Sequence, residues 1–209
     1  TIDEYVEVSR VLSDAEGVGA IELNISCPNI KAGGMTFGCS ATGTRDVVQA
    51  VRRVTTLPLI PKLTPNVTDV AGIAVAAEEA GADAVSLVNT FLAMAIDVET
   101  RRPKLSNGVG GLSGPAIRPI AVRMVHECRQ AVQIPIVGMG GIMTATDVLE
   151  FMIAGATAVQ VGTANFIDPT IWPKLLASLE EYLGRHEVAR VRDVIGTLEL
   201  TEHKGWSNS

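Results

Sequence analysis

The stretch that decides the fold is residues 57–87, LPLIPKLTPNVTDVAGIAVAAEEAGADAVSL. An apolar run at 59–63 comes first, a segment of helical period follows and stops at Gly81, and a second apolar run occupies 84–89. A strand, a helix and a strand in this order predict a right-handed crossover between parallel strands. The stretch therefore predicts an α/β protein.

The same unit occurs twice. LPLI at 57–60 returns as IPIV at 134–137, and AGADAV at 80–85 returns as AGATAV at 154–159. Repeated βα pairs are typical of a (β/α)8 TIM barrel, whereas a doubly wound sheet explains the alternation but less easily the repeat. The predicted strands are 20–26, 59–63, 84–89, 136–139 and 158–161. The predicted helices are 2–15, a helix capped by Thr44 that runs to about 54, one capped by Thr68, and one that starts at Thr144 or Thr146 and stops at Gly155.

Composition narrows the class of protein. The 209 residues carry a formal charge of −6, which argues against a nucleic-acid partner or an anionic membrane. With 47% hydrophobic but only 4% aromatic residues, the core must consist of Ala, Val, Ile and Leu. The length is at the low edge for a TIM barrel, which needs roughly 250 residues.

The cysteines indicate a reducing compartment. Cys27, Cys39 and Cys128 are an odd number without metal-ligand spacing, and they are interpreted as free thiols. The sequence has no signal-peptide pattern and no apolar run of the roughly 18 residues that a membrane span needs. We therefore expect a cytoplasmic protein without a metal site.

Chemistry is expected at the carboxyl ends of the strands, where ligands bind in either architecture. The first end holds Asn24, Cys27 and Asn29, which offer two amides to a planar polar ring and a thiol that can act as a base. Alternatively, Cys27 is a small buried residue and Asn29 a turn former. The Gly-rich segment 31–43 that follows is predicted to be a mobile lid.

Lys62 ends the second strand between Pro61 and Leu63. A lysine in an apolar strand is costly unless its ammonium has a partner, so it either faces an electron-rich cofactor or extends to the rim of the barrel. A third possibility is a Schiff-base amine in a flavin-free lyase or isomerase that binds a phosphorylated substrate.

Two glycine-bearing strand ends predict a phosphate site. Gly140 and Gly141 end one strand, and Gly162 and Thr163 end the next, where barrels bind phosphate through backbone N–H groups. Two ordinary tight turns are the alternative. The glycine run at 110–114 is either a close approach to a ring or a flexible helix entrance, and the basic segment 91–108 is interpreted as a solvated loop. No catalytic role is expected for His126, His186 or His203.

These motifs together resemble class 1 dihydroorotate dehydrogenase, catalytic subunit, and most closely its NAD-linked B type. The resemblance spans essentially the whole chain in order: NISCPN at 24–29, KLTPNVT at 62–68, VNT at 88–90, GGLSGP at 110–115, GMGG at 138–141 and VGTANF at 161–166.

The resemblance implies FMN-dependent oxidation of dihydroorotate to orotate in pyrimidine biosynthesis. Cys27 would remove the C5 proton while the C6 hydride passes to flavin N5. The substrate would be bound by Asn24, Asn29, Asn89 and Thr90. The flavin would be bound by Asn24, Lys62, Val88, Gly114, Gly140, Gly141, Gly162 and Thr163. The implied partners are an electron-transfer subunit with FAD and an iron-sulfur cluster, and a second catalytic subunit within a heterotetramer.

Two departures from the family pattern matter. Cys39 replaces a threonine usual in B-type enzymes, and the related flavin half of dihydropyrimidine dehydrogenase has its acid-base cysteine in the corresponding loop, so Cys39 is the alternative base and pyrimidine-base reduction the alternative reaction. The family also has about three further βα units before this point. We therefore expect residues 1–209 to form one FMN-binding barrel domain that contains only about the last five βα units, and an inactive binding subunit is the non-enzyme alternative.

Overall fold

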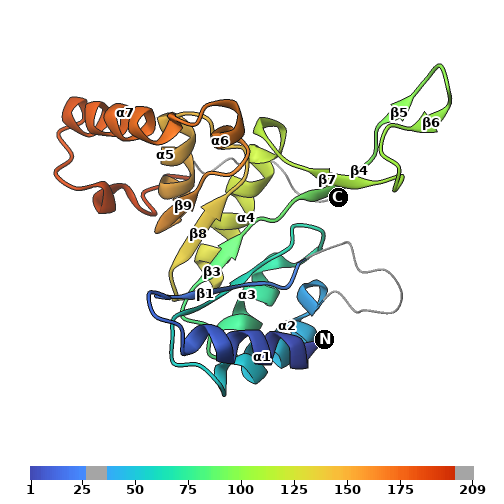
Figure 1. The fold of residues 1–209 in the computed structure, drawn as a ribbon. Helices are drawn as coiled ribbons and strands as arrows, with labels where there is room; N and C mark the ends of the chain where they lie inside the picture. Colours follow the sequence, from blue (N-terminus) through green and yellow to red (C-terminus); the bar gives the residue numbers. More distant parts are fainter. Residues whose placement is uncertain (27–36, 201–209) are drawn as a thin grey trace, which may run out of the picture.

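The computed structural model describes residues 1–26 and 37–200, and its centre is a parallel sheet (Figure 1). The sheet has five strands in the order β1-β2-β3-β8-β9, and every neighbouring pair is parallel. Their bounds are β1 Ile21–Asn24, β2 Leu59–Lys62, β3 Val85–Leu87, β8 Ile136–Met139 and β9 Ala158–Gln160. All five predicted strands are present, β8 with the predicted bounds and the other four slightly shorter. Because the strands follow chain order without a reversal, the winding is that of a barrel and the doubly wound alternative is excluded.

Side chains on the two edge strands show that the sheet is curved. Glu22 on β1 accepts hydrogen bonds from Ser86 Oγ at 2.5 Å and from Gln160 Nε2, on β9, at 3.5 Å. In a flat sheet the first and fifth strands would lie about 19 Å apart, at about 4.8 Å per strand. The sheet therefore curls around a shared interior, as consecutive units of a TIM barrel do.

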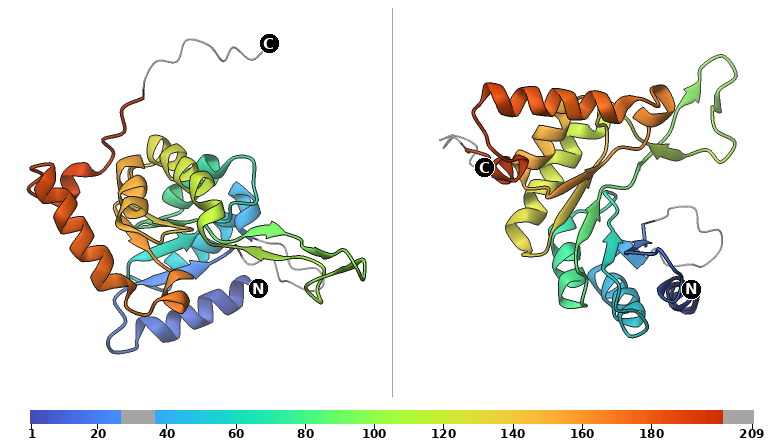
Figure 2. Two further views of the ribbon diagram at one scale, coloured as in Figure 1. Left: turned by 90° about the horizontal axis from the view of Figure 1, so that it is seen from above. Right: turned by 60° about the vertical axis from the view of Figure 1, so that its left-hand side comes forward.

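Helices cover the outer face of this sheet (Figure 2). Consecutive helices from α2 to α5 pack against one another, and α7 packs on α5. The bounds are α1 Ile2–Ser13, α2 Ala41–Arg52, α3 Val70–Glu79, α4 Arg118–Ala131, α5 Ala145–Ala154, α6 Ala164–Ile167 and α7 Ile171–Arg185, with 3-10 turns η1 Phe37–Cys39, η2 Pro115–Ile117 and η3 Val191–Val194.

Two of the four predicted helix starts were wrong. The N-cap of α2 is Ser40 rather than Thr44, and the N-cap of α3 is Asp69 rather than Thr68. In both helices the true cap is the residue whose side chain accepts a hydrogen bond from the first turn. Of the two starts predicted for α5, Thr144 and Thr146, the N-cap is Thr144, in a capping box with Asp147. Helix α1 begins at Ile2 as predicted.

The sequence repeat extends to tertiary packing. Gly81 and Gly155 follow α3 and α5, and both have a positive φ, of 97° and 123°. A Cβ on Gly81 would lie 3.2 Å from the Arg52 side chain, and one on Gly155 would lie 2.4 Å from that of Arg129. Each glycine thus makes room for an arginine at the end of the preceding helix, so the two βα units share this packing detail.

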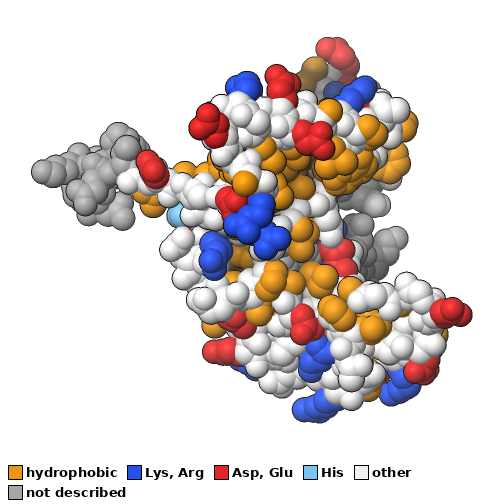
Figure 3. All heavy atoms as spheres, turned by 90° about the vertical axis from the view of Figure 1, so that its left-hand side faces the viewer, with side chains coloured by type: hydrophobic (Ala, Val, Ile, Leu, Met, Phe, Trp, Pro, Cys, Tyr) orange, Lys and Arg blue, Asp and Glu red, His pale blue; other side chains and the backbone are white. Residues whose placement is uncertain are grey.

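The core contains the aliphatic residues that the composition predicts, with one aromatic exception. Phe151 on α5 is fully buried, and a Cβ on Gly138 of β8 would lie 2.6 Å from its ring. Large hydrophobic side chains are exposed at both ends of the curved sheet, including Val11 on α1 and Phe166 on α6. Figure 3 shows exposed hydrophobic side chains among charged ones on one face.

Residues 91–112 form a projecting antiparallel arm rather than the predicted loop (Figures 1 and 2). Strand β4 (Phe91–Ala93) pairs with β7 (Gly110–Leu112), and β5 (Ile96–Asp97) pairs with β6 (Arg102–Pro103). Gly110 and Gly111 are therefore strand residues and not a flexible helix entrance. The arm leaves the sheet at the carboxyl end of β3, next to the predicted site.

The lid prediction is only partly testable, because residues 27–36 lie outside the described part of the chain. The remainder of the predicted lid is helical: η1 occupies 37–39 and α2 begins at Ala41. Gly43 lies in the first turn of α2, where its N–H donates to Ser40 Oγ at 3.1 Å. Among the described residues, no helix has the length and apolar character that crossing a membrane requires.

Candidate active site

The predicted residues gather where the parallel strands end. Asn24 and Lys62 are the last residues of β1 and β2 and lie opposite each other in the register. Lys62 is in turn opposite Ser86 on β3, three residues before Asn89. Tyr5 on α1 donates a hydrogen bond from its hydroxyl to the Asn24 carbonyl at 2.6 Å and so anchors the end of β1.

A network of short polar side chains links the ends of β1 and β3. Asn89 Nδ2 donates to Ser26 Oγ at 2.6 Å and to Asn24 Oδ1 at 3.2 Å, and Ser26 Oγ donates to the same Asn24 oxygen at 3.1 Å. Asn89 Oδ1 accepts from the Thr90 backbone N–H at 2.8 Å. These bonds fix the orientation of both amides, which is the condition for selective binding of a planar polar ring.

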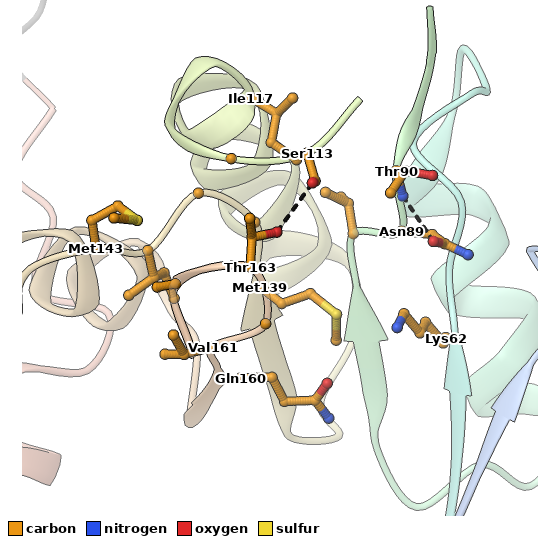
Figure 4. A pocket seen from close by; sticks show the side chains of 17 residues that line it. Lys62, Asn89, Thr90, Ser113, Ile117, Met139, Met143, Gln160, Val161 and Thr163 are labelled. Atoms are coloured by element: carbon orange, nitrogen blue, oxygen red, sulfur yellow. Dashed lines mark hydrogen bonds between the residues drawn. The ribbon is translucent and has the colours of Figure 1, made fainter. Parts of the chain in front are cut away.

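A first cavity opens beside this network, between β2, β3, β8 and β9 (Figure 4). The side chains of Lys62, Met139 and Gln160 extend into the same space from different strands. Across the opposite wall, Ser113 Oγ and Thr163 Oγ1 form a hydrogen bond of 3.1 Å. All predicted cofactor residues except Asn24 line this cavity: Lys62, Val88, Gly114, Gly140, Gly141, Gly162 and Thr163.

The glycines of the cavity serve two different purposes. A Cβ added to Gly114 or Gly162 would meet no protein atom within 4 Å, so these two residues border open space that a ligand can occupy. Gly140 and Gly141 are different, because a Cβ there would point into the protein. On Gly140 it would lie 3.2 Å from Ile117, and on Gly141 it would lie 2.6 Å from the Gly114 carbonyl oxygen.

A second cavity lies on the other side of Asn89 and Thr90, which line both. It is bounded by Asn24 and by the arm, including Leu105, Asn107 and Gly110. The predicted substrate residues Asn24, Asn89 and Thr90 thus share one cavity, and the predicted cofactor residues other than Asn24 share its neighbour. Cys27 and Asn29 lie outside the described residues.

Lys62 is the cation of the first cavity. Within residues 1–26 and 37–200, no carboxylate lies within ion-pair distance of its ammonium group. Among the described residues that line the first cavity, none is an aspartate or a glutamate. A ligand with an electron-rich or anionic edge would therefore meet, at this point, a positive charge that no described residue holds in an ion pair.

Several lining residues were not predicted. Met139 and Gln160 point inward from β8 and β9, and an alternation of inward and outward residues from the predicted strands could have identified them. Asn107 and Leu105 could not be found in this way, because they reach the second cavity only through the folding of the arm.

Two other cysteines have opposite environments. Cys39 is exposed at the end of η1, whereas Cys128 is buried in α4. Burial, with smaller contributions from the charges of Glu127 and Asp69, raises the pKa of the Cys128 thiol to about 12. The structure thus agrees with the interpretation of Cys128 as a packed thiol.

We expect iodoacetamide to alkylate Cys39 rapidly in the folded protein and to leave Cys128 unmodified until unfolding. A thiol pKa raised from 9.0 to about 12 lowers the thiolate fraction about a thousandfold below pH 9, and burial blocks access. Peptide mass spectrometry after timed alkylation measures both sites. Equal labelling of the two cysteines in the native protein would contradict this expectation.

The fold and the site together define a TIM-barrel protein with two adjoining cavities at the carboxyl ends of its strands. A family model described as Dihydroorotate dehydrogenase matches residues 1–183, and the chain belongs to this family. This confirms the resemblance drawn from the motifs.

Individual relatives agree with this assignment. Dihydroorotate dehydrogenase B (NAD(+)), catalytic subunit, of Porphyromonas gingivalis is 55% identical over 203 residues, which are 97% of this chain and 66% of the relative. The protein of the same name from Phocaeicola vulgatus is 55% identical over 199 residues, 95% of this chain and again 66% of the relative. The chain thus spans about 66% of the length of these relatives.

A solved structure has the same fold. The crystal structure of DHODH from Eimeria tenella in complex with ferulenol superposes with a TM-score of 0.76 at 25% sequence identity. The match covers 93% of this chain and 57% of that chain. The chain is therefore a set of βα units from a TIM barrel, as the repeat predicted.

Proposed function

We propose that this protein takes part in the FMN-dependent oxidation of dihydroorotate to orotate, a step of pyrimidine biosynthesis. The observation that carries the proposal is the pair of adjoining cavities, which share Asn89 and Thr90. One cavity has a cation and a glycine-lined cradle suited to a phosphorylated cofactor, and the other has fixed amides suited to a small planar ring. Family membership supports the assignment.

The first cavity fits a flavin nucleotide. Gly114 and Gly162 leave open space where a Cβ would otherwise project, and backbone N–H groups beside such glycines are suitable for phosphate. We assign phosphate binding to Gly140, Gly141, Gly162 and Thr163, and contact with the ring system to Lys62, Val88 and Gly114. When bound, the flavin supplies the acceptor for the hydride that leaves the substrate.

The chain's own residues would orient the substrate and move its proton. Asn24, Asn89 and Thr90, with Asn29 from the sequence motif, would bind the pyrimidine ring in the second cavity. The side-chain amides of Asn24 and Asn89 are already held by hydrogen bonds to each other and to Ser26. Little side-chain conformational entropy would therefore be lost when the substrate binds. Cys27, as the sequence motif predicts, would remove the proton from carbon.

Replacing Lys62 by methionine is expected to lower kcat for dihydroorotate oxidation by about a hundredfold to a thousandfold, the usual loss when a charge-stabilising donor is removed. The Lys62 ammonium group would stabilise the negative charge that develops at the edge of the cofactor. Lys174→Met on α7 is a matched control, because Lys174 is exposed and pairs with Asp168. Steady-state kinetics measures both variants, and equal turnover in both would contradict the assignment of Lys62.

The names of the relatives support a partner subunit. They are called catalytic subunits of an enzyme that uses NAD(+), which implies that another subunit transfers the electrons. We propose that this protein likewise pairs with an electron-transfer subunit carrying FAD and an iron-sulfur cluster, and that two catalytic subunits associate within the complex. The free thiols favour a reducing, cytoplasmic location.

The experiment that tests the cofactor is the absorption spectrum of the purified protein. Bound FMN is expected to give a band at about 450 nm, a general property of oxidised flavins, and addition of dihydroorotate without oxygen should bleach it. A colourless protein that cannot be reconstituted with FMN would refute the proposal. In that case, trapping of a carbonyl substrate on Lys62 by borohydride would support a flavin-free lyase.

A further inference from the structure

A buried carboxylate lies directly behind the glycine-lined wall of the first cavity. Asp147, in the first turn of α5, is only 3% exposed. Its Oδ2 accepts hydrogen bonds from the backbone N–H groups of Met143 and Thr144, each at 2.8 Å. Met143 itself lines the cavity. Asp147 thus determines where the loop that begins at Gly140 meets α5.

The same carboxylate is bound from the opposite wall. Arg118, the first residue of α4, donates a hydrogen bond from Nη1 to Asp147 Oδ1. Its Nε lies 3.0 Å from Glu150 Oε2, in ionic contact but without hydrogen-bond geometry. The side chain of Arg118 is 29% exposed and that of Asp147 only 5%, so solvent screens this pair less than the surface pairs of the chain.

The pair connects two segments of the chain that form two walls of the first cavity, one at Gly114 and one at Gly140 and Gly141. We call these two walls the cradle. Arg118 immediately follows η2, which begins after Gly114, and Asp147 holds the end of the loop that contains Gly141. The walls touch one another at Gly141, where a Cβ would lie 2.6 Å from Gly114 O and 3.0 Å from Arg118 Cβ. A change in the distance between α4 and α5 would therefore change the spacing of these two walls of the cavity.

The pair also has an electrostatic effect. Without Arg118, the buried Asp147 carboxylate would place an unpaired negative charge behind a site that we assign to phosphate. The positive charge of the Arg118 guanidinium offsets the charge of Asp147 and so reduces the electrostatic repulsion of a bound anion.

We infer that Arg118 and Asp147 are a positioning pair, which holds the two walls of the cradle at the spacing required by the phosphate of the cofactor. This inference rests on the proposed function and deepens it. Neither residue lines the cavity, so both act through the backbone that they hold. They should therefore matter for the phosphate and not for the ring system of the ligand.

Comparison of FMN with riboflavin, which lacks the phosphate, tests the inference. In Arg118→Met and in the milder Asp147→Asn, the Kd for FMN is expected to rise about tenfold, or about 1.4 kcal/mol, while the Kd for riboflavin stays within about twofold. Flavin fluorescence quenching measures both. Arg123→Met is the matched control, because Arg123 lies on the same helix in an exposed pair with Glu127. An equal loss for both ligands, or no loss for either, would overturn the inference.

A second readout separates this result from a failure of the proposed function. If the wild-type protein does not bind FMN, the proposed function fails, but the positioning role is still measurable by amide hydrogen exchange. Met143 and Thr144 N–H groups are then expected to exchange about tenfold faster in both variants than in Arg123→Met, since their acceptor is no longer held. Unchanged exchange at both amides would overturn the positioning role as well.

Discussion

Replacement of Gly141 by valine is expected to abolish FMN binding. Gly141 has a φ of 77°, a left-handed conformation that costs about 1–2 kcal/mol for an L side chain. The new Cβ would also lie 2.6 Å from the Gly114 carbonyl oxygen, and such overpacking costs about 1–3 kcal/mol. The steric clash pushes apart the two walls that we assign to the phosphate, and the backbone strain adds to the cost of keeping residue 141 in place.

The flavin content of the purified variant measures this effect. The ratio of flavin to protein absorbance is expected to fall to background, and added FMN should not restore it. Gly19→Ala is the control, because Gly19 has no protein atom within 4 Å of an added Cβ and no positive φ. A Gly141→Val protein that binds FMN with the wild-type Kd would show that the cradle is not the phosphate site.

Cys27→Ser is expected to lower the rate of dihydroorotate oxidation by about a hundredfold to ten-thousandfold, the range in which a general base contributes. A serine hydroxyl is far less acidic than a thiol, so it cannot hold the anionic form that accepts the proton. The prediction rests on the sequence motif at 24–29, because Cys27 lies outside the described residues. Anaerobic stopped-flow bleaching of the flavin, with FMN content as a check on folding, measures the step.

Cys39→Ser is the matched variant, and its turnover is expected to stay near that of the wild type. Cys39 is exposed at the end of η1, and it lines a separate cavity with Asn66 and Asp69 rather than either of the cavities described above. Full activity in Cys27→Ser together with a large loss in Cys39→Ser would reverse the assignment. The reaction would then resemble that of the dihydropyrimidine dehydrogenase flavin half.

The strands and their order were predictable because they depend on local apolar runs and on a repeat. All five strands were found within three residues of their ends, and the glycines that end α3 and α5 were identified. The N-caps Ser40 and Asp69 were missed, because Thr44 and Thr68 lie close to them in the sequence and have side chains that can also cap a helix. Which of them caps a helix depends on where the chain enters it, and tertiary packing decides that.

The arm was missed for a different reason. Residues 91–112 contain two glycines in β7 and a basic turn, so they lack the β-branched enrichment that marks a strand. The pairing of Phe91 with Leu112 joins residues far apart in the sequence, and no local pattern predicts it. The residues of the amide network, in contrast, could be predicted, because Asn24 ends β1, Asn89 follows β3, and the carboxyl ends of parallel strands lie at the same edge of a sheet.

The sequence by itself determined the barrel class, the family, and the set of strand-end residues, since periodicity, repeat and motif are properties of the linear chain. Only the tertiary structure decided what each residue meets. It separated Gly114 and Gly162, which border open space, from Gly140 and Gly141, which allow two walls to touch. It also joined Arg118 to Asp147 across two helices. The physical reason is that steric contact and charge pairing depend on distances in space, which the order of residues does not contain.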